Sequence, residues 1–144
     1  MSVAEILHRK GRHVSTARSI DTVEAAIRQL YDERIGALVV LNRWGKIVGM
    51  FSERDAIHAL ARHGSEALQY EVHELMTPDV TTCSPGDRID AVMELMSVHR
   101  VRHLPVMEEE KLVGIVSMGD LVKQRLDEKQ QEANTLLDLA RARR

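Results

Sequence analysis

Apolar and polar residues follow two kinds of spacing along this chain, and these spacings occur in the same order twice. Apolar residues three or four positions apart indicate helices, because that spacing places them on one helix face. Short β-branched runs bounded by turn residues indicate strands. The first predicted series is preceded by a helix at 3–10 and consists of a strand at 13–16, a helix at 21–33, a hairpin at 37–51 and a helix that begins at 52. The second predicted series is preceded by a short helix at 72–76 and consists of a strand at 80–83, a helix at 87–99, a hairpin at 103–116 and a helix that begins at 117.

The junction between the hairpin and the last helix of each series carries one motif. Gly49-Met50-Phe51-Ser52-Glu53-Arg54-Asp55 matches Gly114-Ile115-Val116-Ser117-Met118-Gly119-Asp120 in its glycine, serine and aspartate, at identical spacing. Residues 14–41 also align with residues 80–107 without a gap. The chain therefore contains two repeats of one supersecondary unit.

The motif allows two interpretations, one structural and one functional. A serine before a helix can cap it, and an aspartate three positions later completes a capping box. Alternatively, the free N–H groups of the first helical turn attract an anion, the glycine lets a ligand approach the backbone, and the aspartate accepts hydrogen bonds from a ribose diol. One copy alone favours the cap, whereas two intact copies favour ligand sites at Asp55 and Asp120.

Each series has the order β-α-β-β-α and too little apolar surface to be stable alone. We expect the two repeats to bury their apolar faces against each other about a pseudo-twofold axis, which gives an α/β sandwich. The expected divisions are residues 1–68 (first repeat with the N-terminal helix), 69–126 (second repeat) and 127–144 (a helical tail). The leucines of the tail allow either a surface helix or packing on a second subunit.

Composition restricts the class of protein. A chain of 144 residues with 44% apolar and 29% charged residues is typical of a globular protein. A net charge of −2 and 3% aromatic residues argue against a nucleic-acid partner, which would require a basic surface or stacking platforms. No apolar run reaches the ~18 residues of a membrane span, and charges interrupt the N-terminal segment as they do not in a signal peptide. We expect no membrane partner and a cytoplasmic location.

Residues for catalysis or metal binding do not form a recognisable constellation. The single cysteine, Cys83, excludes an internal disulfide and a cysteine-based zinc site. The only histidines four positions apart, His99 and His103, are separated by a break between a predicted helix and a predicted strand. No glycine-rich phosphate loop occurs. The sequence therefore predicts a binding module with no catalytic residues and no metal site.

The duplicated motif, together with Arg102-His103-Leu104-Pro105-Val106, resembles a tandem cystathionine-β-synthase (CBS) domain pair over about residues 3–126. The resemblance implies an α/β sandwich with two symmetry-related clefts, and a regulatory homodimer that binds an adenine nucleotide (AMP, ADP, ATP or NAD) and requires no other cofactor. One alternative is a structural dimerisation module whose clefts are vestigial. Another, a remnant of inosine monophosphate dehydrogenase, is disfavoured because the chain has no barrel sequence.

The residues predicted to bind the ligand are Thr16, Ser52, Arg54, Asp55, Thr82, Arg102, His103, Ser117 and Asp120. The aspartates are assigned to the ribose, the serines to phosphate, and the threonines at the strand ends to the purine edge. In related proteins the two residues before Leu-Pro-Val often contact phosphate, which implies that role for Arg102 and His103; a solvated basic strand end is the alternative. Arg54 opposes the macrodipole of its helix, so a nearby anion would explain its position.

The two clefts are predicted to be unequal. Gly36 and Ala37 stand in the first repeat where Arg102 and His103 stand in the second, so only the second cleft has cations on its strand. A guanidinium suits the geometry of a phosphate. The second cleft should therefore prefer the more phosphorylated nucleotide, and S-adenosylmethionine is disfavoured because its cation would face Arg102.

Overall fold

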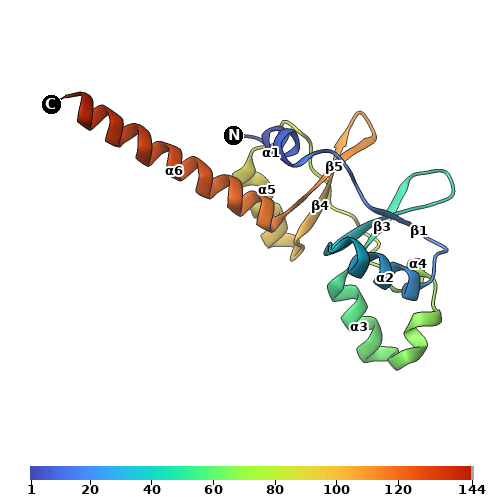
Figure 1. Ribbon diagram of the computed structural model, residues 1–144. Coiled ribbons are helices and arrows are strands. Elements are labelled where there is room, and N and C mark those ends of the chain that lie inside the picture. The colour runs from blue at the N-terminus through green and yellow to red at the C-terminus, as the bar shows by residue number, and fades with distance from the viewer. Residues whose placement is uncertain (144) are drawn as a thin grey trace. The chain divides into compact units, whose positions relative to one another are not determined.

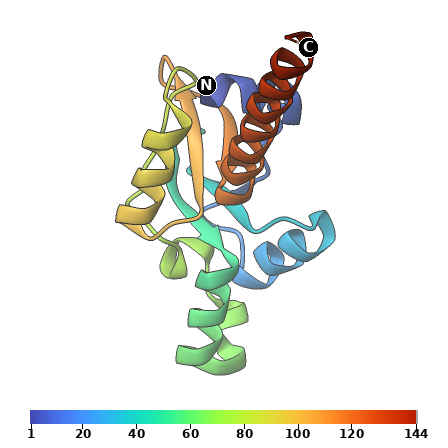
Figure 2. The same cartoon turned by 90° about the vertical axis from the view of Figure 1, so that its left-hand side faces the viewer.

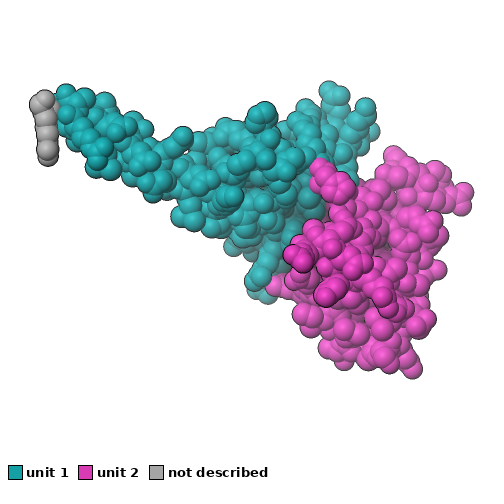
Figure 3. All heavy atoms as spheres, in the orientation of Figure 1, with its two compact units in different colours: residues 1–12, 82–144 teal, residues 13–81 magenta. Residues whose placement is uncertain are grey.

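The computed structural model describes residues 1–143, and the chain forms two compact units (Figure 3). Unit 2 is the continuous segment His13–Thr81, whereas unit 1 combines residues 1–12 with the chain from Thr82 onward. Each unit has its own sheet and its own buried apolar cluster. The mixed α/β fold predicted from the sequence is confirmed.

Unit 2 is built on a three-stranded sheet in the order β1-β2-β3 (Figure 1). Its elements are β1 (Thr16–Arg18), α2 (Val23–Glu33), β2 (Ala37–Leu41), β3 (Ile47–Ser52), α3 (Glu53–His63), the 3₁₀ helix η1 (Gly64–Gln69) and α4 (Val72–Leu75). β1 is parallel to β2 because helix α2 makes the crossover, and β3 returns antiparallel to β2 as a hairpin. The fully buried side chains of Val23, Leu38, Phe51 and Val72 join the sheet to the helices.

Unit 1 is built on the two-stranded antiparallel sheet β4-β5. Its elements are α1 (Val3–Lys10), α5 (Ile89–His99), β4 (His103–Glu108), β5 (Lys111–Ser117) and α6 (Met118–Ala142). Helix α1 contacts both β5 and α6. The buried cluster combines Ile6 and Leu7 of α1 with Met96 of α5, Leu104 of β4 and Leu121 of α6.

The first strand of each repeat differs from the prediction. The strand expected at 13–16 lies at Thr16–Arg18, and the one expected at 80–83 is reduced to a single bridge between Cys83 and Val106. In unit 2, Val39 N donates a hydrogen bond to Ser15 O at 3.2 Å. The matching residue in unit 1 is Pro105, which has no N–H, so the ladder cannot extend in the same way.

The short helices exchange places between the two repeats. Helix α1 precedes the first repeat, yet it buries Val3, Ile6 and Leu7 in the core of unit 1. Helix α4 precedes the second repeat, yet it buries Val72 in the core of unit 2. The grouping of the N-terminal helix with residues 1–68 therefore follows the sequence repeat and not the packing.

The motif glycines make room for these exchanged segments. A Cβ atom at Gly114 would lie 2.6 Å from Leu7 Cδ2, and one at Gly49 would lie 2.8 Å from Thr77 O and also collide with Met76 Sδ. Contacts this short do not occur, so a larger residue at either position would displace the segment. Protein chain thus fills the space in front of each glycine, which corrects the prediction that the glycine admits a ligand there.

Helix α6 continues without interruption into the predicted tail. It begins at the Ser117 cap and spans 25 residues. Figures 1 and 2 show its C-terminal part, in red, extending beyond the other elements of unit 1. Residues 127–142 of the predicted tail thus belong to α6, whereas Arg144, the last residue of that tail, lies outside the described residues.

Candidate functional site

Both copies of the motif form the same helix cap. In unit 2, Ser52 Oγ accepts a hydrogen bond from Asp55 N at 3.4 Å, and Asp55 Oδ2 accepts one from Ser52 N at 2.8 Å. In unit 1, the corresponding distances between Ser117 and Asp120 are 3.1 and 2.9 Å. The structural interpretation of the motif is therefore correct for both copies, and any ligand must bind to an aspartate that is already held by its cap.

The first N–H group of each capped helix is also used inside the protein. Glu53 N donates to Gly36 O at 3.0 Å, and Met118 N donates to Arg102 O at 2.8 Å. With the cap, three of the first four N–H groups of each helix have partners. Most of the N–H groups that would attract an anion at each helix N-terminus therefore already have a partner within the protein.

In unit 2 the sheet register brings the predicted residues to one face. Thr16 pairs with Val39, and Ser52 pairs with Ala37, two positions earlier on the same strand. Side chains of paired residues, and of residues two apart on a strand, point to the same face of a sheet. Thr16 and Ser52 therefore share a face, with Asp55 in the first turn of α3 beside them. The carbonyl of Thr16 accepts a hydrogen bond from Gln29 Nε2 at 3.1 Å, which fixes the end of β1 on α2.

The Asp55 carboxylate has a second partner from the segment that follows α4. Thr77 Oγ1 donates to Asp55 Oδ1 at 2.9 Å, while Ser52 N and Ser52 Oγ both donate to Asp55 Oδ2. The partner of Asp55 Oδ1 is thus a neutral hydroxyl. Glu53 and Arg54, both exposed, occupy the two positions between the serine and the aspartate.

In unit 1 the register places His103 directly beside Ser117, because the two residues pair across β4 and β5. The backbone of Arg102 contacts the first residue of α6 through the bond from Met118, and its side chain is exposed. Thr82, also exposed, lies one position before the bridge that joins Cys83 to β4. Arg102 and His103 thus lie at the start of α6 with Ser117, and Thr82 lies beside β4.

The Asp120 carboxylate has a cationic partner from helix α1. Lys10 Nζ donates to Asp120 Oδ2 at 2.6 Å and to Ile115 O at 3.0 Å. The two side chains are 24% (Asp120) and 35% (Lys10) exposed. Partial burial by itself raises the pKa of Asp120, but the hydrogen bonds from Lys10 and Ser117 and the charge of Lys10 outweigh it and lower that pKa below its ordinary value of 3.8. Asp120 is therefore held as a carboxylate in an ion pair.

Sequence reasoning missed Lys10 and Thr77 as neighbours of the two aspartates. Leu7 and Met76 each pack against the motif glycine of their unit. Helix α1 continues past Leu7 to Lys10, whereas α4 ends at Leu75, before Met76. This extra helical turn carries Lys10 to Asp120. The sequence signal was the difference in length between the two short helices, together with a lysine in the added turn.

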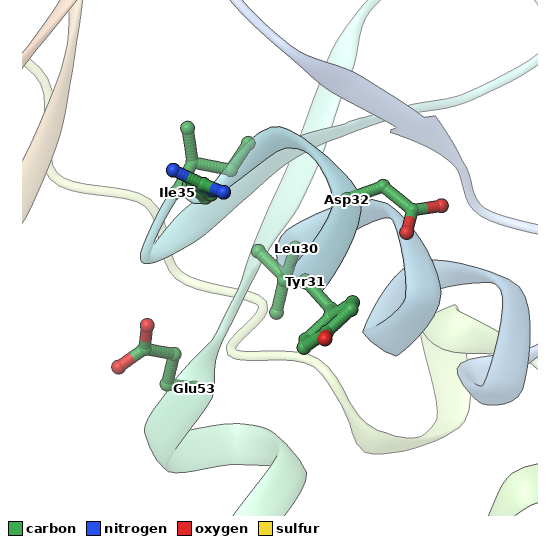
Figure 4. A pocket seen from close by; sticks show the side chains of 6 residues that line it. Leu30, Tyr31, Asp32, Ile35 and Glu53 are labelled. Atoms are coloured by element: carbon green, nitrogen blue, oxygen red, sulfur yellow. The ribbon is translucent and has the colours of Figure 1, made fainter.

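A surface hollow of about 530 Å³ lies in unit 2 between the end of α2 and the start of α3 (Figure 4). Its lining consists of Leu30, Tyr31, Asp32, Arg34, Ile35 and Glu53. Glu53 adjoins two predicted site residues, Ser52 and Arg54, but neither of these lines the hollow. Two carboxylates and one guanidinium give the hollow no preference for an anion.

Residues 1–143 offer neither a membrane-spanning helix nor a cluster of metal ligands. Within that range no helix combines the length and apolar character that a membrane span requires. Within the same range no group of three or more His, Cys, Asp or Glu side chains is placed to hold a metal ion.

This chain is similar to known proteins both in sequence and in structure. Residues 3–62 and 72–127 each match the family model described as CBS domain. The crystal structure of the CBS-domain containing protein ATU1752 from Agrobacterium tumefaciens superimposes with a TM-score of 0.84 and 40% identity, covering 86% of this chain and 92% of that one.

A plant protein and the CBS domain pair of a protein named MJ0100 are also similar to this chain. The CBS domain-containing protein CBSX3, mitochondrial, of Arabidopsis thaliana is 27% identical over 143 residues, which are 94% of this chain and 69% of the relative. The CBS domain pair of protein MJ0100, crystallised with 5′-methylthioadenosine and S-adenosyl-L-methionine, has a TM-score of 0.76 and 27% identity, covering 86% of this chain and 98% of that one.

Proposed function

The chain belongs to the CBS-domain family, and from this premise we propose that it is a non-catalytic regulatory module that binds an adenine nucleotide, which is AMP, ADP, ATP or NAD. The similar MJ0100 pair holds two adenosine derivatives, which supports the adenosine part of the ligand. The homodimer and the cytoplasmic location expected from the sequence remain predictions within this proposal.

The observation that carries the proposal is the pair of half-buried carboxylates, Asp55 and Asp120, each fixed by its own capping serine. An ionised carboxylate offers about four acceptor positions; the bonds described for Asp120 use two of them and those for Asp55 use three, so that at Asp55 the ribose diol would take the place of the Thr77 donor. A ribose diol supplies two O–H donors at the spacing of a carboxylate. The rigid position of each aspartate supports ribose recognition, because little side-chain freedom remains to be lost on binding.

The phosphate is proposed to bind in unit 1. Lys10, Arg102 and the imidazole of His103 lie around the start of α6, whereas unit 2 has Thr77, Gly36 and Ala37 at the corresponding places. A partly exposed ion pair is worth about 0–1 kcal/mol, and a hydrogen bond to a charged group about 1.5–3 kcal/mol. We propose that Lys10 turns from Asp120 to the phosphate when a ribose diol takes its place on the carboxylate, so that both charged groups keep a partner.

A thermal-shift series on the full chain tests the proposal. A ligand that binds only the folded protein stabilises it by about 2.7 kcal/mol at a hundredfold excess over Kd, which raises the melting temperature by several degrees. AMP and NAD should produce this shift, whereas CMP, which has the same ribose phosphate and a pyrimidine, should not. No shift with any adenine nucleotide at millimolar concentration would favour the structural dimerisation module.

A further inference from the structure

The turn between β2 and β3 carries the only tryptophan of the chain, and this side chain is exposed. Trp44 is 71% exposed and lies in the sequence Asn42-Arg43-Trp44-Gly45-Lys46, here called the Trp44 turn. Figure 1 shows the turn, in turquoise, projecting beyond the sheet of unit 2. Burial in the core therefore does not explain why a tryptophan stands at this position.

Hydrogen bonds hold the backbone of the Trp44 turn in one conformation. Asn42 Oδ1 accepts from Trp44 N at 2.9 Å and from Lys46 N at 3.0 Å. Asn42 N donates to Lys46 O at 2.9 Å, and Gly45 N donates to Asn42 O at 3.0 Å. Gly45 has a φ of 76°, which glycine adopts without strain. The backbone that presents Trp44 is thus ordered before a partner arrives, which lowers the entropy cost of binding.

The corresponding turn of the second repeat shows that the hairpin does not need these side chains. That turn contains Glu108, Glu109 and Glu110, all exposed, between the paired strands β4 and β5. The two hairpins thus close around turns of opposite charge, and only the first turn has an aromatic residue. The Trp44 turn therefore has a composition that the fold does not require.

The Trp44 turn combines an aromatic surface with two cations. The guanidinium carbon of Arg43 lies 4.6 Å from the centroid of the Trp44 ring, over its face. Lys46 is also exposed, and the turn contains no carboxylate. Within the described part of the chain, neither the Arg43 nor the Lys46 side chain forms an ion pair. The end of β1, which pairs with β2 beside the hairpin, adds no net charge, because Arg18 is paired with Asp21.

We propose that the Trp44 turn binds an acidic segment of another protein, in which carboxylates flank an apolar side chain. A guanidinium stacked on an indole keeps its N–H groups directed outward along its edge, where they donate in pairs to a carboxylate. Lys46, two positions after Trp44, supplies the second cation, and the uncovered part of the indole receives the apolar side chain. Tryptophan and arginine are among the residues that most often dominate the binding energy of protein interfaces.

A protein fits this surface better than a membrane or a nucleic acid does. Stable attachment to anionic lipid through basic residues takes a cluster of about four to eight of them, and the turn has two. Arg43 already occupies one face of the indole on which a nucleic-acid base would stack. An acidic protein segment is therefore the occupant that the charge and the aromatic surface of the turn favour together.

A random peptide library displayed on phage tests the chemistry of the partner without assuming its identity. The full chain serves as the target, and the variant Trp44→Ser removes peptides that bind elsewhere on the protein. The peptides that depend on Trp44 should be rich in Asp and Glu beside an apolar residue such as Leu or Phe. Peptides without carboxylates, or no peptide that depends on Trp44, would overturn the proposal.

Tryptophan fluorescence then measures the contact itself, since Trp44 is the only tryptophan of the chain. A selected acidic peptide, synthesised without tryptophan, should change this emission on titration, and its Kd should rise with salt concentration. Arg43→Gln should weaken binding at least tenfold, and Lys46→Gln by a smaller factor. The matched control Lys111→Gln, at the exposed lysine beside the acidic turn of β4 and β5, should bind the peptide as the wild type does.

Thermal unfolding separates this role from a structural one. Arg43→Gln and Trp44→Ser should melt at the temperature of the wild type, because both side chains are exposed. Binding of AMP should also be unchanged in both variants, because the turn contains none of the residues proposed for the nucleotide. A lower melting temperature in both variants would assign the turn a structural role and overturn the proposal.

Three other occupants of the turn would also overturn it. Anionic lipid vesicles or a single-stranded oligonucleotide would do so by binding the wild type more tightly than the acidic peptide does. Self-association of the wild type that Glu109→Lys abolishes would do so as well, because the acidic segment would then belong to a second copy of this chain.

Discussion

The two copies of the capped motif have the same backbone geometry and different neighbours. Ser52 with Asp55 and Ser117 with Asp120 form equivalent capping boxes. Yet the hydroxyl of Thr77 donates to the first aspartate, and the ammonium of Lys10 to the second. Local sequence therefore determines the cap, while the charge around it is determined by segments that arrive from elsewhere in the chain.

The two residues between the serine and the aspartate also differ in charge between the two copies. The first turn of α3 contains Glu53 and Arg54, whereas the first turn of α6 contains Met118 and Gly119. In unit 2 the carboxylate of Glu53 offsets the charge of Arg54, whereas unit 1 has no charged side chain at these two positions. From this comparison we expect one site that recognises the nucleoside and one that also recognises its phosphate.

The largest effect is expected from removing an aspartate. Asp120→Ala should abolish binding at the unit 1 site and leave the unit 2 site nearly intact, and Asp55→Ala should do the reverse, since each carboxylate is the proposed ribose acceptor of its own site. Isothermal titration with AMP, supported by circular dichroism to confirm folding, would measure this as a fall from two bound ligands to one. Loss of both sites in either folded variant would contradict the assignment.

The next effect concerns the arginine before Leu-Pro-Val. Arg102→Ala should weaken AMP binding in unit 1 roughly ten- to a hundredfold, because one hydrogen bond to a charged group is worth about 1.5–3 kcal/mol. Gly36→Arg should strengthen AMP binding in unit 2 by a smaller factor. Wild-type affinity in Arg102→Ala, with no gain in Gly36→Arg, would exclude a phosphate role for this position.

Lys10 should affect nucleotides and nucleosides differently. Lys10→Met keeps the length of the side chain and removes its charge, so the preference of unit 1 for AMP over 5′-methylthioadenosine should fall about tenfold. The neutral ligand should bind equally well or slightly better, because Asp120 no longer has a competing donor. The matched control is Thr77→Val, which removes the corresponding partner of Asp55 and should leave the preference unchanged. Equal loss of both ligands in Lys10→Met would assign Lys10 a purely structural role.

The smallest effect is on stability against pH. Because the folded-state pKa of Asp120 is lowered, its ion pair stabilises the protein above the ordinary value of 3.8, and this contribution is lost as pH falls through the lowered pKa. Lys10→Met should therefore unfold at lower urea concentration than wild type at pH 7, by roughly up to 1 kcal/mol, and the gap should close on acidification. The control Lys46→Met, at an exposed position before β3, should show no such dependence on pH. A gap that widens in acid would contradict the ion pair.

Sequence patterns predicted most of this fold because its signals are local. The periodicity of α2 and α5, the hairpins and both capping boxes each depend on residues close together in the chain. The family resemblance added two further predictions, the adenine-nucleotide ligand and the phosphate contact of Arg102. The partners of the aspartates could not be predicted in this way, since Lys10 and Asp120 are brought together only when α1 packs on the unit formed by the second repeat.

The single bridge at Cys83 shows a second limit of sequence reasoning. The apolar run at 80–83 has the character of a strand, but Pro105 on the neighbouring strand cannot donate to it. Pro105 thus prevents strand pairing in a segment that is far from it in sequence. A check of which backbone N–H groups are available in the predicted strands at 80–83 and 103–107 would have revealed the missing hydrogen bond.

The central claim is that the chain binds adenine nucleotide at two unequal sites. Isothermal titration of the full wild-type chain with AMP, and separately with 5′-methylthioadenosine, tests it most directly. We predict two binding events for AMP with clearly different dissociation constants, and a smaller difference between the sites for the ligand that lacks the phosphate. Two identical sites for AMP, or no binding of either ligand, would contradict the account.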